Sequence, residues 1–147
     1  MQVSLDKIVV KPGQQLLLQD ISWSDLEAIL EDLGETRGSR ISYSNGALEI
    51  MVPLLEHEKH KEIIGEIVRI VLDKLEIDFE ALGSSTLKNK QMNQAVEADT
   101  CFYIENYRAV IGKDRLDLTI DLPPDLAIEI NITNRTYLTP CATLIRD

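Results

Sequence analysis

The chain has 147 residues, of which 44% are hydrophobic, with only seven Gly and five Pro; this composition fits one globular domain and excludes a disordered chain. A net charge of −10 argues against nonspecific coating of nucleic acid, which draws on Lys and Arg, but it allows an acidic site where a divalent cation faces phosphate. No apolar run could span a membrane, the N-terminus lacks the order of a signal peptide, and two cysteines without a CxxC pair indicate a reduced, cytoplasmic setting.

Local signals predict a helix and then a hairpin after a lead-in segment of about 20 residues. Ser22 or Ser24 can cap a helix whose apolar residues recur at helical spacing until Gly34 ends it. Asn45-Gly46 lies between two alternating segments, in the stretch 40–53, and predicts a two-residue turn with positive φ.

A long amphipathic helix is predicted from Glu56 to about Glu76, with an apolar stripe that includes Ile63, Ile67 and Ile70. Its first turn gathers titratable groups, namely Glu56, His57, Glu58 and His60. The ordinary explanation of these acids is that negative charge is favourable at a helix N-terminus. The alternative is a role in chemistry, in which His57, or Glu49 in the preceding hairpin, orients water or carries a proton.

The second half of the chain is predicted to consist mostly of strands, at 77–83, near Leu87, at 95–104, at 116–120 and at 125–132. In the last of these, Leu126, Ile128, Ile130 and Ile132 share one face, which we expect to be buried. The fold class is therefore α/β (α+β), a single domain over 1–147 in which a mixed sheet packs against the long helix.

Two carboxylates of neighbouring strands form the first candidate site. Asp99 and Glu129 each lie on the less apolar face of their strand, where two acids can hold a Mg²⁺-type ion and position a water for attack on a phosphodiester. The ordinary alternative is a pair of solvated acids. Lys88, beyond a strand end, could stabilise negative charge on a phosphate, although a lone lysine usually serves solubility.

Five ordered segments resemble the Uma-two family of restriction endonucleases, in the PD-(D/E)XK nuclease superfamily. They are Gly46–Pro53, Glu56–Glu58, Leu82–Leu87, Val96–Ile104 and Pro123–Ile130. The resemblance covers roughly residues 22–137 and implies a restriction-endonuclease-like core that hydrolyses DNA with Mg²⁺ (or Mn²⁺).

Position by position, the resemblance makes Asp99 and Glu129 the metal-binding acids, with Glu49 and His57 at the family's hairpin glutamate and helix-start histidine. DNA is the expected partner, no membrane is involved, and a homodimer is compatible with this interpretation. Lys88 is proposed as the catalytic lysine because Asn131 stands two residues after the second acid, where the superfamily has lysine.

A second departure concerns the end of the chain. Family members continue into a helix and further strands with a Tyr-Gly-Val-like segment, and residues 137–142 do not follow that pattern. We therefore expect the core to be missing or divergent after about residue 137. The alternative function is a catalytically inactive scaffold that binds a protein partner, or a truncated non-functional member; a glycoside hydrolase ranks last, because only seven aromatic residues could build a sugar platform.

Overall fold

The computed structural model describes residues 7–34, 38–113 and 116–130. Its elements, in chain order, are β1 (Gln15–Leu18), α1 (Trp23–Leu33), β2 (Arg40–Ser44), β3 (Ala47–Met51), α2 (Leu55–Lys74), β4 (Glu80–Leu82), β5 (Ser85–Asn89), β6 (Gln94–Ala98), β7 (Thr100–Tyr103), the 3-10 helix η2 (Tyr107–Ala109) and β8 (Leu126–Ile128). The expectation for residues after 137 lies outside the described residues. Neither α1 nor α2, the α-helices of this described part, has the length and apolar character that a bilayer crossing requires.

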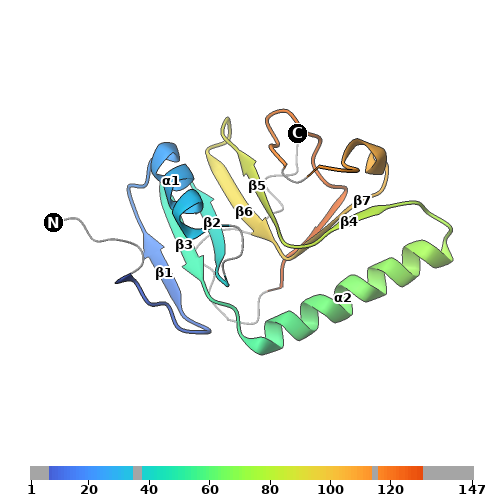
Figure 1. Cartoon of the computed structure of the whole chain (residues 1–147), viewed down its shortest axis with the longest axis horizontal. Coiled ribbons are helices and arrows are strands. Elements are labelled where there is room, and N and C mark those ends of the chain that lie inside the picture. Colours follow the sequence, from blue (N-terminus) through green and yellow to red (C-terminus); the bar gives the residue numbers. More distant parts are fainter. Residues whose placement is uncertain (1–6, 35–37, 114–115, 131–147) are drawn as a thin grey trace.

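The strands form two sheets, in the orders β1-β3-β2-β6-β5 and β4-β7-β8 (Figure 1). The predicted α+β class is confirmed. The expectation of a mixed sheet is corrected, because every pairing among the described strands is antiparallel. Short connections account for the β2–β3 and β5–β6 hairpins, since parallel pairing needs long crossovers.

The capping and turn predictions are confirmed at residue level. Ser22 caps α1 through a capping box with Asp25, and Gly34 ends the helix with φ 70°. Asn45 and Gly46 adopt φ 48° and 92° between β2 and β3, as a two-residue hairpin turn of this type requires.

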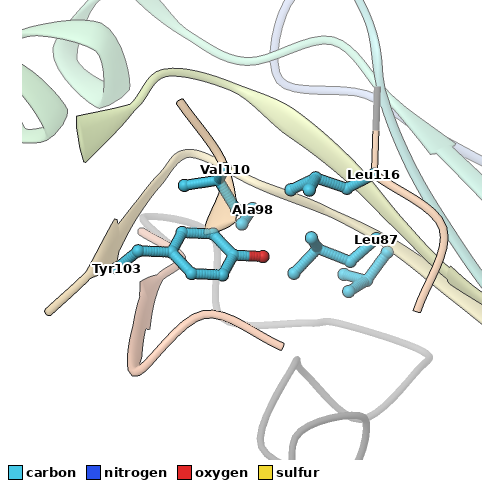
Figure 2. Packing of buried hydrophobic residues seen from close by; sticks show 6 residues of the cluster. Leu87, Ala98, Tyr103, Val110 and Leu116 are labelled. Carbon is cyan, nitrogen blue, oxygen red and sulfur yellow. The ribbon is translucent and has the colours of Figure 1, made fainter. Parts of the chain in front are cut away.

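Two apolar clusters hold the fold together. One lies between α1 and the five-stranded sheet and contains Leu26, Ile41, Tyr43, Leu48, Ile50 and Ala95. The other joins the two sheets and contains Leu87, Val96, Ala98, Tyr103, Val110 and Leu116; Figure 2 shows the Tyr103 ring packed among these aliphatic side chains. The Tyr103 hydroxyl donates to Leu122 O at 2.8 Å, so its polar end is satisfied although the residue is buried.

Helix α2 forms as predicted, but only a narrow face of it is buried. His57, Gly65 and Leu72 are the buried residues of the helix, and α2 extends along one side of the molecule in Figure 1. Ile63, Ile67 and Ile70 are each more than half exposed. The apolar stripe predicted from the sequence therefore faces away from the described body of the protein.

Several strand predictions need correction. Residues 116–120 contain no strand, and 118–120 form a turn, because Asp117 and Asp121 accept local backbone hydrogen bonds. Within 77–83 only β4 pairs, and within 125–130, the described part of the last predicted strand, only β8 pairs. The expected buried face is not found there, because Leu126 is exposed and Ile128 and Ile130 are half-buried, and Ile132 lies outside the described residues. The lead-in contains a strand, β1, that pairs with β3. The segment 95–104 is divided at Asp99 into β6 and β7.

Candidate active site

Asp99 stands at the junction of the two sheets. β6 belongs to the five-stranded sheet and β7 to the three-stranded one, and Asp99 is the residue between them. Its backbone N–H donates to Ile128 O at 2.9 Å, which ties the junction to β8. The residue is 1% exposed, so its carboxylate needs compensating partners.

Three groups supply that compensation. Arg40 Nε lies 3.2 Å from Oδ1, His57 Nε2 lies 3.1 Å from Oδ2, and the Ile130 N–H donates to Oδ2 at 2.7 Å. Arg40 opens β2 and His57 lies in the first turn of α2. The structure thus gathers β2, α2, the β6–β7 junction and the end of β8 around one buried carboxylate.

A second layer of charges continues from Arg40 toward solvent. Arg40 Nη2 contacts Glu58 Oε1 at 3.4 Å and Ser84 Oγ at 3.0 Å, and Lys61 Nζ contacts the same two residues at 3.5 and 3.0 Å. Burial alone would raise the pKa of Glu58, but the charges of Lys61 and Arg40 outweigh it and hold that pKa below its ordinary value. Ser84 is exposed and the Glu58 side chain is 41% exposed, so the cluster is open to solvent on this side.

The predicted site residues divide into those near Asp99 and those elsewhere. His57 contacts Asp99 directly, and Glu129 directly follows β8, between the two residues whose backbones bond Asp99. Because β7 and β8 pair with Thr100 opposite Ile128, Asp99 and Glu129 stand at the same end of this strand pair. Glu49 is buried in the middle of β3, opposite Ser42.

Lys88 lies on β5, and its Nζ is 3.9 Å from Glu27 Oε1 of α1. The ion-pair partner of Lys88 is thus on α1, the helix that covers the apolar cluster around Leu26. The lysine that contacts residues of the Asp99 cluster is Lys61. Arg40, Lys61 and Ser84 were not singled out from the sequence. The one sequence signal for Arg40 is that it shares the polar face of β2 with Ser42. That signal does not identify its partner, because Asp99 is 59 residues away along the chain.

Buried carboxylates are not all part of this cluster. Glu97, one residue before the end of β6, accepts hydrogen bonds from the Ile41 N–H at 3.1 Å and from Thr86 Oγ1 at 3.2 Å. These bonds span the β2–β6 and β5–β6 pairs. Glu97 is therefore explained as a structural acid that links three strands.

The ligand types at the Asp99 cluster suit a divalent cation, because Asp99 and Glu129 have the carboxylate oxygens that Mg²⁺ prefers. The arrangement of these ligands, however, is not that of a preformed metal site. Among the described residues no group of three or more His, Cys, Asp or Glu side chains is gathered as a metal cage. Arg40 and His57 face the two oxygens of Asp99, so a metal would have to compete with them for this carboxylate.

Comparison with known proteins gives one family. The model of the Uma2 family, described as "Putative restriction endonuclease", matches residues 23–139. Comparisons with curated proteins and with solved structures gave no match. The matched range includes every residue of the cluster around Asp99.

Proposed function

The chain belongs to the Uma2 family, and on this premise we propose that it is an endonuclease that hydrolyses DNA phosphodiester bonds with Mg²⁺ or Mn²⁺. The observation that supports the proposal best is the buried Asp99 at the end of the β7–β8 pair, next to Glu129 and beside a solvent-open edge that carries Arg40 and Lys61.

The two acids would hold the divalent ion, Asp99 at the sheet junction and Glu129 directly after β8. When bound, such an ion neutralises phosphate charge and lowers the pKa of a water molecule. His57 Nε2, 3.1 Å from Asp99, can hold or carry a proton at that atom. Its place at the start of α2 keeps the imidazole buried and oriented. Glu49 stays a predicted assisting residue.

Positive charge for the phosphate would come from the open edge of the cluster. The ammonium of Lys61 and the guanidinium of Arg40 both contact the exposed Ser84 hydroxyl. A phosphate bound at Ser84 would therefore meet two cations, and one of them, Arg40, also contacts Asp99. We propose Lys61 for the role first assigned to Lys88, namely stabilising negative charge that develops on the phosphate. These two side chains supply local positive charge in a chain whose net charge is −10, and both also contact Glu58.

Nicking of supercoiled plasmid in the presence of Mn²⁺ tests the proposal. We expect the wild type to nick the plasmid and both Asp99→Asn and Glu129→Gln to lose at least about 100-fold in rate. Glu105→Gln is the matched control, because Glu105 is an exposed acid past the end of β7. Intact plasmid with the folded wild type would favour the inactive scaffold instead.

A further inference from the structure

The exposed side of α2 carries a stripe of aliphatic residues that the described body of the protein leaves open. We define the α2 stripe as Ile63, Ile64, Ile67, Ile70 and Val71, each between 36% and 58% exposed. The buried positions of the helix, His57, Gly65 and Leu72, recur every seven or eight residues and so define the opposite face. A patch of this kind, on the order of several hundred Å², marks an interaction site on a soluble protein.

The residues along this face follow the spacing of a helix that pairs with another helix. Alternating steps of four and three residues lead along the face through Glu56, His60, Ile63, Ile67, Ile70 and Lys74. This is the a/d repeat of two packed helices, with the aliphatic positions in the middle and a charge of opposite sign at each end. Glu56 and Lys74 form no ion pair with another described residue.

We propose that a second copy of this chain covers the α2 stripe, with the two α2 helices antiparallel about a twofold axis that passes midway between Ile63 and Ile67 on the exposed face. In this register Ile63 meets the partner's Ile67, and Glu56 meets the partner's Lys74. Because a twofold interface uses each contact twice, the charges at both ends are satisfied. A parallel pair would instead place Glu56 against Glu56 and Lys74 against Lys74. The charge pattern therefore selects a self-complementary antiparallel partner.

Light scattering or sedimentation over a range of protein concentrations measures the assembly. We expect the wild type to dimerise and Ile67→Glu to raise the dimer Kd by on the order of 100-fold, since it buries two charges per dimer in an apolar interface. Ile120→Glu is the matched control, because Ile120 is 84% exposed and lies outside α2; its Kd should equal that of the wild type. A wild type that stays monomeric, or equal effects of the two substitutions, would overturn the proposal.

Charge reversal tests the antiparallel register. Glu56→Lys and Lys74→Glu should each weaken the dimer about tenfold, because each places like charges together at both ends of the interface. The double variant should return to within about threefold of the wild type. Within one helix these residues are about 27 Å apart, so the rescue cannot arise inside a monomer. Both reversals oppose the helix dipole, so the double variant should be thermally less stable than either single variant, although its dimer affinity recovers.

Additive loss of affinity in the double variant would reject this register.

Discussion

Replacing Arg40 by Met tests whether a side-chain cation now competes for the carboxylate that should bind metal. Arg40 Nε lies 3.2 Å from Asp99 Oδ1, and its side chain is only 16% exposed. Met keeps much of the volume of the side chain and removes the charge. Two unit charges about 4 Å apart interact by about 4 kcal/mol at an effective dielectric constant of 20. His57 and the Ile130 N–H stay with the carboxylate, and solvent screens part of the interaction.

We therefore expect a net gain of about 1.4 to 3 kcal/mol in metal affinity, which is a tenfold to hundredfold lower Kd for Mn²⁺. Calorimetric titration measures this directly. The stability of the ion-free protein should move in the opposite direction, with a loss of about 2 kcal/mol, because Asp99 keeps a buried charge with one cation fewer. Arg108→Met is the control, since it removes the same charge from an exposed position beside Tyr107. An unchanged Kd in Arg40→Met, or an equal gain in the control, would refute the competition.

Three further predictions address the roles of single side chains. Lys61→Met should slow plasmid nicking at least tenfold at saturating Mn²⁺, whereas Lys88→Met, which breaks only an ion pair with α1, should leave the rate unchanged. Ser22→Ala should lower the free energy of unfolding in urea by about 1 kcal/mol, because the N-cap of α1 is lost, and an unchanged midpoint would contradict that role. Burial raises the pKa of Tyr103 to about 12, so the folded state loses stability as the pH rises from about 10 to 12; Tyr103→Phe should show a shallower decline over this range in unfolding experiments, and identical slopes would count against it.

The parts of the fold that depend on residues adjacent in the sequence could be predicted from the sequence. Ser22, Gly34 and the Asn45-Gly46 turn act through their own backbone geometry, and the structure has each where the pattern indicated. α2 was likewise predicted to within two residues at its C-terminal end. What the periodicity could not give was the side of α2 that is buried, because an apolar stripe indicates burial without saying against what.

From the sequence, Asp99 and Glu129 could be proposed as site acids, but the cations beside Asp99 could not be foreseen. Asp99 and Glu129 stand out because a carboxylate within an apolar strand needs an explanation. Arg40 and Lys61 do not, since a lysine or arginine at a strand start or on a helix looks like an ordinary surface residue. Only the fold brings Arg40 to Asp99 across 59 residues, and only the division of 95–104 at Asp99 exposes its role as a junction.

Hydrolysis in ¹⁸O-labelled water tests the central claim, which is that the cluster around Asp99 directs water at a DNA phosphodiester. The wild type with Mn²⁺ and a duplex oligonucleotide should yield products whose new terminal phosphate carries one ¹⁸O atom by mass spectrometry. Asp99→Asn, folded by circular dichroism, should yield almost none of this product. Unlabelled ends from the wild type, or equal labelled product from Asp99→Asn, would contradict the proposed site.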